Sequence, residues 1–488
     1  MTDDTLILSH FIDGERLQAG PTSQDVSPSD ASDIVAAWGA ANSSLADQAV
    51  DAAVSAAPAW ASLTGAHRGE ILSVAAQELD RRAEELGRVL AREEGKTYPE
   101  AVAEVRRAAQ IFSFHAGQAI RNTGMLVESV RSGVEIAVTK EPVGVVSVIS
   151  PWNFPIAIPA WKIAPALAYG NTVVFKPAEI VPASAWLLVD VLHRAGLPAG
   201  VLNLVLGRGR DVGDTLTGRA GVSAVTFTGS EATGRQVLQR TSERGVRAQL
   251  EMGGKNALVV LDDADLDLAV SQALNGSFGS TGQRCTASSR LIVTDRIHDA
   301  FVERLSAAMT GWKVGHALGE GIDMGPVASQ SQLAQNLEYL TGAVAAGREV
   351  VGGEVVACDT EGHFMRPSLV LDTVAGDRIN REEVFGPVAS ILRVSDYEQA
   401  LSTANDTPYG LTAGIITTSL AAATHFRAHA RVGMVMVNLA TAGVDFHVPF
   451  GGRGASSFGP REQGEQAREF FTQTKTAYVS AGSPIQLR

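Results

Sequence analysis

Apolar residues recur every three or four positions between residues 44 and 121, which predicts a helical region. Ser43 or Ser44 is expected to cap its first helix, and Pro58 is expected to stop or bend that helix. A second helix is predicted from about residue 66, with a charged outer face that ends near Gly95. These helices are expected to support the unit that follows them in the chain.

Three shorter stretches alternate between apolar and polar residues, which predicts strands. Residues 6–17 alternate around a turn at Asp13 and Gly14, which indicates a short hairpin. Residues 125–142 alternate around a turn at 131–133 and indicate a longer hairpin, and residues 470–479 alternate as well. An isolated hairpin is marginally stable and its open edges invite pairing. The tail is therefore expected to lie along the long hairpin; the alternative is an edge strand folded back on its own subunit.

Strands and helices alternate in the rest of the chain, first over residues 143–250 and then over about 256–453. This alternation predicts an α/β fold with parallel sheets, helices on both faces and ligands at the carboxyl ends of the strands. A nucleotide site is therefore expected in the first of these units.

Two glycine-containing turns are candidates for that nucleotide site. Residues 207–213 look like a dinucleotide fingerprint, but the third glycine comes one residue late, so we interpret them as an ordinary turn. Gly229 and Ser230 instead lie between a predicted strand and a helix that starts at Glu231. Free main-chain N–H groups and the helix dipole can meet a pyrophosphate there, so we expect the phosphates at this turn.

Composition and charge narrow the class of protein. The chain has 488 residues, 45% hydrophobic and 19% charged, which fits a globular protein of two or three domains. A net charge of −13 without clustered Lys and Arg argues against nucleic acid and favours small-molecule ligands. No apolar run approaches the ~20 residues of a membrane span, and the acidic residues 1–5 do not begin a signal peptide. Cys285 and Cys358, without paired spacing, argue against a disulfide scaffold and favour a cytoplasmic location.

Cys285 is the leading candidate for chemistry, because it lies in a glycine-punctuated polar run, residues 279–289, between two apolar segments. A cysteine of ordinary pKa is mostly protonated at neutral pH, so it needs a nearby base or an electropositive pocket to act as a nucleophile. Glu251 is a candidate base, since it ends a predicted strand before the glycine pair 253–254, where the backbone can turn sharply beside a ligand. The alternatives are a small buried cysteine and a solvated strand-end carboxylate.

Seven separated motifs, in this order along the chain, resemble those of the aldehyde dehydrogenase family. They are residues 150–155, 176–179, 227–230, 250–255, 282–286, 382–387 and 449–452. The resemblance covers nearly the whole chain and implies an aldehyde dehydrogenase-like α/β fold with a Rossmann-type cofactor domain, an α/β catalytic domain and a small β oligomerisation hairpin. It implies that residues 1–121 and 142–253 form the NAD(P)-binding domain and 254–453 the catalytic domain. Residues 122–141 and 468–484 would form the oligomerisation segment of a homodimer or homotetramer.

The resemblance also implies a mechanism. Cys285 would attack the aldehyde carbon, and the side-chain amide of Asn153 with the main-chain N–H of Cys285 would bind the resulting oxyanion; one such donor is worth about 3–4 kcal/mol. Hydride would pass to NAD or NADP and leave a thioester, which water would cleave to the acid. Glu251 would activate the thiol and then the water, which requires that burial raises its pKa towards neutrality. Without the other motifs, Asn153 fits equally well as a turn residue before Pro155.

The same motifs imply the cofactor-binding residues. Lys176 and Glu179 match the family's adenosine-ribose residues, and a carboxylate on the 2′-hydroxyl favours NAD over NADP, although family members with this glutamate can accept both. Glu383 matches the glutamate on the nicotinamide ribose, with Phe385 beside the ring; the alternative is a pair of charges, residues 382–383, that caps a turn. The remaining implied cofactor residues are Ser150, Trp152, Gly229 and Ser230.

Within the family, four stretches are similar to the α-ketoglutaric semialdehyde (2,5-dioxopentanoate) dehydrogenase branch, namely residues 155–162, 282–290, 442–450 and 459–464. The similarity implies a small semialdehyde substrate. The candidate substrate residues are Arg284, Phe154 and Phe450, with Arg284 as the counter-ion of a keto acid unless it pairs within the fold. Trp161 stands where succinate-semialdehyde enzymes carry a carboxylate-binding arginine, which argues against that substrate. The chain departs from the branch at Ala440 and at residues 454–455, near the expected substrate entrance.

Three alternative functions remain open. The first is a dehydrogenase for another aliphatic or aromatic aldehyde. The second is a non-catalytic structural protein of the same fold, although Cys285, Glu251 and Asn153 are all present. The third is a CoA-acylating dehydrogenase, a branch that usually lacks the base at Glu251.

His425 and His429 have the i, i+4 spacing of a zinc-binding pair on a helix. Phe426 stands where a metalloprotease motif needs a glutamate. We therefore predict no metal site and a solvated helix face.

Overall fold

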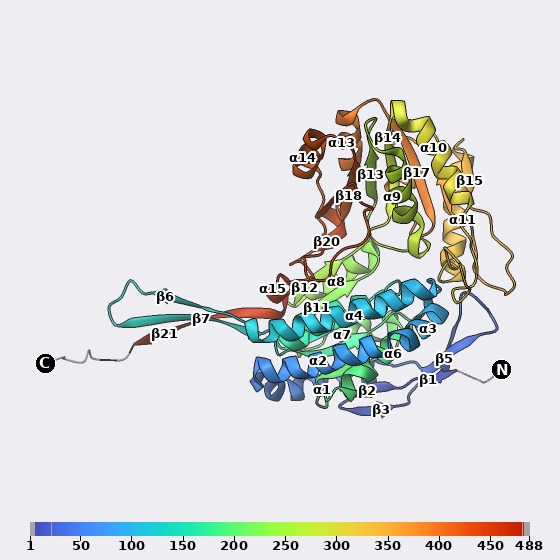
Figure 1. The fold of residues 1–488 in the computed structure, drawn as a ribbon. Helices are drawn as coiled ribbons and strands as arrows, with labels where there is room; N and C mark the ends of the chain where they lie inside the picture. The colour runs from blue at the N-terminus through green and yellow to red at the C-terminus, as the bar shows by residue number, and fades with distance from the viewer. Residues whose placement is uncertain (1–4, 21, 481, 483–488) are drawn as a thin grey trace.

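The computed structural model describes residues 5–20, 22–480 and 482. The predictions for the N-terminus and the tail fall partly on residues 1–4, 481 and 483–484, which lie outside the described residues. The described residues form four sheets. Two large α/β sheets stand one above the other, and a long arm projects from the lower body (Figure 1). On the side away from the arm lies a small sheet of β1 (Leu6–Ile7), β5 (Ile34–Gly39) and β4 (Thr22–Val26). No helix among the described residues is long and apolar enough to cross a membrane.

The lower sheet has eight strands in the order β20-β12-β11-β8-β9-β10-β2-β3. Its five central strands run parallel and are largely buried: β8 (Val145–Ile149), β9 (Thr172–Lys176), β10 (Leu202–Leu204), β11 (Val222–Thr228) and β12 (Arg247–Glu251). The antiparallel edges are β20 (Ser457–Phe458) on one side and the predicted hairpin, β2 (His10–Ile12) and β3 (Glu15–Leu17), on the other. Asp13 and Gly14 have φ of 54° and 79°, which a two-residue hairpin turn requires.

Helices cover this sheet, and the first of them begins differently from the prediction. They are α1 (Ser43–Ser62), α2 (Gly65–Arg81), α3 (Ala83–Glu94), α4 (Tyr98–Gln118), the short η1 (Ala119–Arg121), α5 (Ala157–Ala168), α6 (Pro182–Arg194), α7 (Gly209–Gly218), α8 (Glu231–Glu243) and α15 (Ala467–Phe471). Asn42 caps α1 rather than Ser43 or Ser44, because its side chain accepts the N–H of Leu45 at 3.0 Å. The helix continues past Pro58 to Ser62, so Pro58 does not stop it.

Two further elements correct the sequence prediction. The expected second helix is two helices, α2 and α3, separated at Arg82, and Gly95 ends the later one with a φ of 96° as predicted. Residues 207–213 are not an ordinary turn, because α7 starts within them. Val212 and Leu216, one turn apart on α7, are fully buried. Packing of this apolar face therefore stabilises a helix, although the glycines alone favour a turn.

The upper sheet has seven strands in the order β15-β16-β17-β14-β13-β18-β19. They are β13 (Asn256–Val260), β14 (Ser288–Thr294), β15 (Val350–Gly352), β16 (Ser368–Val370), β17 (Val388–Val394), β18 (Thr412–Ile416) and β19 (Met434–Val437), parallel except for β15. Its helices are α9 (Leu266–Phe278), α10 (Asp295–Thr310), α11 (Gln330–Ala345), α12 (Arg378–Arg381), α13 (Tyr397–Asn405) and α14 (Leu420–His429). The strands read as apolar runs because helices cover both faces, which confirms the α/β prediction.

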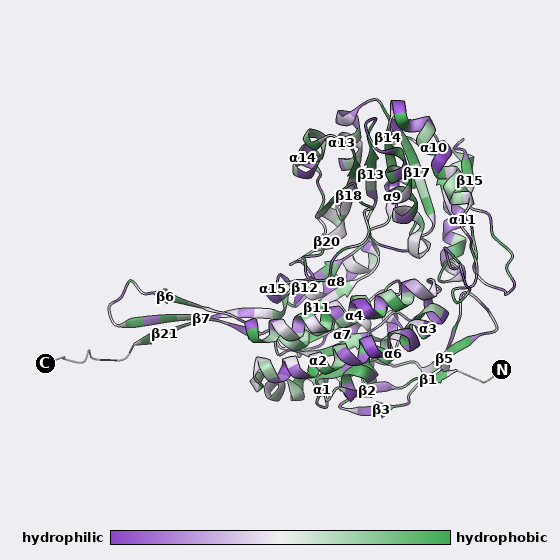
Figure 2. Ribbon diagram, in the orientation of Figure 1, coloured by the Kyte–Doolittle hydropathy of each residue, from purple (hydrophilic) through white to green (hydrophobic). Residues whose placement is uncertain are grey.

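The arm consists of β6 (Met125–Glu128), β7 (Val134–Pro142) and β21 (Thr472–Ser480). The tail strand pairs antiparallel with β7 over its whole length, as the alternation predicted. Figure 2 shows hydrophobic residues along the arm, and the exposed ones include Met125, Leu126, Val127, Val130, Tyr478 and Val479. The arm therefore presents apolar surface that the described part of this chain leaves uncovered.

The two large sheets meet at the carboxyl ends of the lower strands. Strand β12 ends at Glu251, and the chain enters β13 through the glycine-containing residues 252–255. The turn after β8 and the loop before β14 approach the same place, because Asn153 of the first bonds to Gln283 of the second. This junction is where the sequence-predicted chemistry gathers.

Candidate active site

Cys285 lies in the loop between α9 and β14, which has an unusual backbone shape. After α9 comes a tight turn, Gly279–Gly282, in which Ser280 and Thr281 have φ of 51° and 56°. Non-glycine residues in this left-handed region cost about 1–2 kcal/mol each. The far end of the loop is anchored, since the amide of Asn256 donates to the carbonyl oxygen of Cys285 at 2.7 Å. Contacts from outside the loop therefore place the cysteine.

The Cys285 thiol is protonated at neutral pH. Burial, followed by the negative charges of Glu383 and Glu251, raises the pKa of Cys285 to about 12. Cys285, Glu383 and Phe385 line one cavity. Of the two ways to activate the thiol, the surroundings supply a base and not an electropositive pocket, so a proton acceptor has to act during attack.

Glu251 is the last residue of β12 and is 3% exposed. Its Oε2 accepts a hydrogen bond of 2.5 Å from the hydroxyl of Ser457, whereas no donor among the described residues reaches Oε1. Burial and the charge of Glu462 raise the pKa of Glu251 well above its ordinary value, against the opposing effects of Ser457 and Lys162. A carboxylate in this setting holds a proton closer to neutral pH, which is what a general base needs.

A buried ion pair next to Glu251 was not assigned to the site by the sequence analysis. Lys162 on α5 and Glu462 form it, with side chains 0% and 1% exposed. The ammonium of Lys162 also donates to the hydroxyl of Thr226 at 2.9 Å. The sequence carried a signal for Lys162, because a lone lysine in the apolar residues 155–170 has to find a buried partner. No pattern could name a partner 300 residues away.

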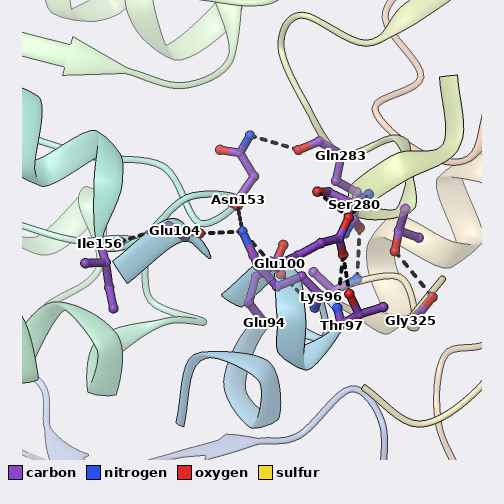
Figure 3. A network of polar contacts seen from close by, with 12 residues as sticks. Glu94, Lys96, Thr97, Glu100, Glu104, Asn153, Ile156, Ser280, Gln283 and Gly325 are labelled. Atoms are coloured by element: carbon purple, nitrogen blue, oxygen red, sulfur yellow. Dashed lines mark hydrogen bonds and ion pairs between the residues drawn. The ribbon is translucent and has the colours of Figure 1, made fainter. Parts of the chain in front are cut away.

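Asn153 reaches the Cys285 loop directly. It lies between β8 and α5, is 3% exposed, and its Nδ2 donates to the main-chain oxygen of Gln283 at 2.8 Å (Figure 3). Gln283 is two residues before Cys285 in the chain. One N–H of the amide is used in this bond, and the other is left for a ligand.

Glu383 and Phe385 lie between α12 and β17. Oε1 of Glu383 accepts the N–H of Gly254 at 2.8 Å, and a Cβ on Gly253 would lie 2.2 Å from Oε2. Gly253 is thus explained by the close approach of the Glu383 carboxylate, whereas a Cβ on Gly254 would lie 2.9 Å from Oδ1 of Asn256 and 3.1 Å from the carbonyl oxygen of Cys285. Burial raises the pKa of Glu383 to about 7. Phe385 has a φ of 60°. Its ring packs edge-on against that of Trp152, with the ring centroids 5.3 Å apart.

The residues expected at the adenosine lie at the end of β9. Lys176 is buried and donates to the carbonyl oxygen of Pro177 at 2.8 Å, and burial lowers its pKa to about 8. Glu179 is exposed, and its Oε1 accepts the main-chain N–H of Gly209, the first residue of α7, at 3.2 Å. The misread segment 207–213 therefore borders the expected ribose position.

The turn expected to hold the phosphates joins β11 to α8. The N–H of Gly229 donates to the carbonyl oxygen of Glu251 at 3.1 Å, and Ser230 caps α8 by accepting the N–H of Thr233. Ser150, after β8, has a buried hydroxyl without a partner among the described residues. These positions at the carboxyl edge of the lower sheet agree with the location that parallel sheets use for nucleotides.

Arg284 and Phe154, two of the three expected substrate residues, make contacts within the fold. The guanidinium of Arg284 donates to the carbonyl oxygen of Asn275 in α9, and its Nε has no partner among the described residues. The ring of Phe154 lies 4.0 Å from Nζ of Lys96.

Phe450, the third, ends a loop that spans the site. The loop, residues 442–450, follows Thr441, whose hydroxyl donates to the carbonyl oxygen of Thr286, the neighbour of Cys285, at 2.6 Å. At its other end Phe450 is buried with its ring 5.3 Å from that of Trp161. The two ends of this loop therefore lie beside the Cys285 loop and beside Trp161.

Arg107 on α4 faces the same loop and was missed by the sequence analysis. Its half-buried guanidinium lies 5.9 Å from the ring of Phe446, and the exposed Asp445 is close enough to act on its charge. No local motif marks this arginine, because the loop that it meets is more than 300 residues away in sequence.

The remaining candidate groups lie elsewhere. His425 and His429 stack with ring centroids 3.8 Å apart, and Nδ1 of His425 bonds to the hydroxyl of Tyr397 at 2.7 Å. Cys358 is half-buried, with its sulfur 3.9 Å from the carbonyl oxygen of Val314. Across residues 5–20, 22–480 and 482, no group of three or more His, Cys, Asp or Glu side chains could hold a metal ion.

The lower parallel sheet meets a second α/β sheet at a half-buried thiol, a buried carboxylate and a buried amide, an arrangement that fits an oxidoreductase with a nucleotide cofactor. The family model described as "Aldehyde dehydrogenase family" matches residues 17–477. The chain belongs to the aldehyde dehydrogenase family.

Comparison with individual proteins agrees. The chain is 42% identical over 475 residues to alpha-ketoglutaric semialdehyde dehydrogenase of Bacillus subtilis (strain 168), covering 96% of this chain and 97% of that protein. It is 42% identical over 487 residues to alpha-ketoglutarate semialdehyde dehydrogenase of Haloferax volcanii, covering 98% and 100%. Among solved structures, a betaine aldehyde dehydrogenase from Staphylococcus aureus in complex with NAD+ superposes with a TM-score of 0.95 at 32% identity, covering 99% and 96%. The resemblance read from the motifs is confirmed.

Proposed function

We propose that this enzyme oxidises a small semialdehyde to the carboxylic acid with NAD or NADP, through a covalent intermediate on Cys285. One observation carries the proposal: three groups from distant parts of the chain converge. The charge of Glu251 acts on the Cys285 thiol, and the amide of Asn153 bonds to the loop that carries the thiol.

The chemistry follows from the protonation states. Deprotonated Glu251 takes the proton of Cys285 as the sulfur attacks the aldehyde carbon, and the carbonyl electrons move to oxygen. The free N–H of Asn153 and the main-chain N–H of Cys285 then bind the oxyanion. When bound, the nicotinamide ring supplies the acceptor for the hydride that leaves this carbon, and a thioester on Cys285 remains. Glu251 releases the thiol proton to solvent and then takes a proton from the water that attacks the thioester. The tetrahedral intermediate expels the sulfur of Cys285, which is reprotonated from Glu251, and the acid leaves.

The residues present fit a nicotinamide dinucleotide. Glu383 would hold the nicotinamide ribose beside Phe385 and Trp152, and Gly229 and Ser230 would hold the phosphates. Support comes from Gly253, whose missing side chain leaves room for the Glu383 carboxylate, and from the helix N-terminus that follows Ser230. Lys176 and Glu179 would hold the adenosine ribose, with Ser150 nearby. The exposed carboxylate of Glu179 favours NAD, the cofactor in the S. aureus structure.

For the substrate we propose α-ketoglutaric semialdehyde. Two relatives at 42% identity carry that activity in their names. A carboxylate-bearing substrate needs a cation near the entrance, and Arg107 and Arg284 are the candidates. The contact of Arg284 with Asn275 and the half-buried position of Arg107 favour Arg107.

A second candidate function is oxidation of an aldehyde with a quaternary ammonium group. The observation that favours it is the pair of rings of Trp161 and Phe450, because aromatic faces attract cations. A betaine aldehyde dehydrogenase of Bacillus subtilis is 37% identical over 427 residues. The charge of Arg107 near the entrance opposes a cationic substrate, so we rank this function second.

The test is turnover of NAD and NADP with a panel of semialdehyde acids, betaine aldehyde and neutral aliphatic and aromatic aldehydes. We expect the highest kcat/KM for α-ketoglutaric semialdehyde, and Arg107→Met should lower it at least tenfold with little effect on a neutral aldehyde. Arg284→Met is the matched comparison. Cys285→Ala should abolish oxidation of every substrate while Cys358→Ala leaves it unchanged, and full activity of Cys285→Ala would refute the mechanism.

For assembly we propose a homodimer or homotetramer built through the arm, because its exposed apolar residues need a partner surface. We further propose that residues 1–121 and 142–253 act as the cofactor domain, residues 254–453 as the catalytic domain, and residues 122–141 and 468–484 as the bridging segment. We propose a cytoplasmic location, supported by two cysteines that remain free.

A further inference from the structure

The start of α4 carries a buried cluster of charges that no step above uses. Lys96 and Glu94 are each 1% exposed, Glu104 is 4% exposed, and Glu100 takes part in the same network (Figure 3). Burial of this many charges is costly unless each is paired and hydrogen-bonded. The hydrogen-bond partners of these side chains show which backbone segments the cluster holds in place.

The Lys96 ammonium makes two hydrogen bonds and one contact with an aromatic ring. Nζ donates to Oε2 of Glu104 at 2.6 Å and to the main-chain oxygen of Asn153 at 2.7 Å, and the ring of Phe154 lies 4.0 Å away. Burial favours the neutral amine, but the charges of Glu104 and Glu94 outweigh it and raise the pKa of Lys96. Lys96 is therefore a fixed cation bound to the backbone of Asn153.

Glu104 holds the other side of the same turn. Its Oε1 accepts the main-chain N–H groups of Ile156 and Ala157, at 2.9 and 3.0 Å, where α5 begins. The carbonyl of Asn153 and these two N–H groups are thus bound to one ion pair, formed by Lys96 just before α4 and Glu104 on α4. Both ends of the turn that aims the Asn153 amide are fixed.

Glu100 lies in the first turn of α4, four residues after Lys96, and holds the Cys285 loop. Its Oε1 accepts the N–H of Ser280 at 2.8 Å and the hydroxyl of Ser280 at 3.0 Å. Its Oε2 accepts the N–H and the hydroxyl of Thr97, which caps α4. Glu100 thereby pins the backbone of Ser280 and its neighbour Thr281 at the positive φ values that start the loop.

We propose that Lys96 is a positioning residue for the oxyanion site: with Glu104 it fixes the backbone of Asn153, while Glu100 on the same helix start fixes the Cys285 loop. One rigid element then sets the distance between the two oxyanion donors, the Asn153 amide and the Cys285 N–H. The proposal rests on the proposed function of Asn153. A purely structural cluster would make the same bonds yet leave the rate per folded molecule unchanged when it is removed.

The test measures single-turnover thioester formation in the full-length enzyme. Lys96→Met should slow this step about 10–100-fold, with the KM for NAD changed less than about threefold, because loss of one oxyanion donor costs about 10²–10³-fold. The primary isotope effect with deuterated aldehyde should rise as hydride transfer from the aldehyde carbon becomes limiting. Lys96→Arg, which keeps the charge and can still donate, should recover part of the rate.

A double-mutant cycle separates positioning from general damage. Asn153→Ala alone should lose about 10²–10³-fold, and adding Lys96→Met should cost less than about threefold more, because the misplaced amide is already gone. Multiplicative losses would overturn the positioning role. If Asn153→Ala by itself has no effect, the proposed function of Asn153 fails instead.

Two variants guard against misfolding. Lys96→Met combined with Glu104→Gln leaves no unpaired charge at this ion pair, and it should show the same slow thioester formation. Arg68→Met is the matched control, since Arg68 is also a buried cation that donates to main-chain carbonyls, those of Ala168 and Leu63. It should lower the melting temperature without changing the rate per folded molecule; an equal slowing in both would refute the proposal.

Discussion

The hydroxyl of Ser457 donates a hydrogen bond of 2.5 Å to Oε2 of Glu251 and accepts one of 2.6 Å from the main-chain N–H of Gly452. Because the Gly452 N–H already points at its oxygen, the hydroxyl proton of Ser457 is directed towards the carboxylate. Ser457 thus stabilises ionised Glu251, whereas burial and Glu462 favour the protonated form. The balance between them sets the pH at which the base is available.

Removal of the Ser457 hydroxyl is expected to shift the increase of activity with pH to higher pH. Ser457→Ala should raise the pKa of Glu251, since a hydrogen bond to a charged group is worth about 1.5–3 kcal/mol, or about one to two pH units. A raised pKa means that less base is deprotonated at neutral pH, so kcat should fall there and recover at higher pH. Ser368→Ala, which removes a buried hydroxyl bonded to the carbonyl of Pro387, is the control. An unshifted kcat profile in Ser457→Ala would disprove the role.

Glu251→Gln is expected to separate the two jobs of the base. If the second job, activation of water, is the more demanding, thioester should accumulate after hydride transfer, because loss of a positioned base costs about 10²–10⁴-fold. Rapid mixing should then show a stoichiometric burst of NADH followed by very slow turnover, and mass spectrometry should show an acyl adduct on Cys285. Absence of both would mean that Glu251 is needed first for thiol attack, and full turnover would remove it from the mechanism.

The protonated state of Cys285 predicts how the free enzyme reacts with iodoacetamide. With a pKa of about 12, the thiolate fraction should increase about tenfold per pH unit. The logarithm of the alkylation rate, plotted against pH, should therefore rise with a slope near one between about pH 7 and 10, without reaching a plateau. Peptide mapping of the modified site measures it, with Cys285→Ala as the blank. A plateau below pH 8 would contradict the burial argument.

A methyl group on Gly253 is expected to disturb the nicotinamide end of the site. In Gly253→Ala the new Cβ would lie 2.2 Å from Oε2 of Glu383, so the carboxylate has to move. We expect the KM for NAD to rise at least tenfold. Gly342→Ala is the matched control, because a Cβ there meets nothing within 4 Å inside α11; it should leave the KM unchanged and stabilise the helix by about 0.5–1 kcal/mol.

Deletion of the tail strand is expected to dissociate the assembly. Without residues 472–488 the arm loses β21, and the edge of β7 is left unpaired. Light scattering should show a smaller mass than that of the full chain at micromolar concentration. A chain that ends after Ser480 keeps the strand and is the control. A stable monomer of the full chain, or a deletion with unchanged mass, would rule out the arm as the interface.

The sequence by itself determined the elements whose causes are local. Alternation fixed both hairpins and the tail strand, because side chains of a strand face opposite sides in turn. Apolar runs between helical stretches fixed the two parallel sheets. Where local signals competed, the prediction failed: Asn42 took the cap expected of its serine neighbours, and burial of Val212 turned an apparent loop into α7.

Only the tertiary structure decided how the chemistry is arranged. It brought Lys162 to Glu462, Asn153 to the Cys285 loop, and Lys96 to the backbone of Asn153. The motifs named the thiol, the base and the amide, but the raised pKa values of Cys285 and Glu251 arise from burial and from charges distant in sequence. Contacts of this kind depend on how the two large sheets meet. The periodicity of apolar residues along the chain does not encode which residues distant in sequence come together.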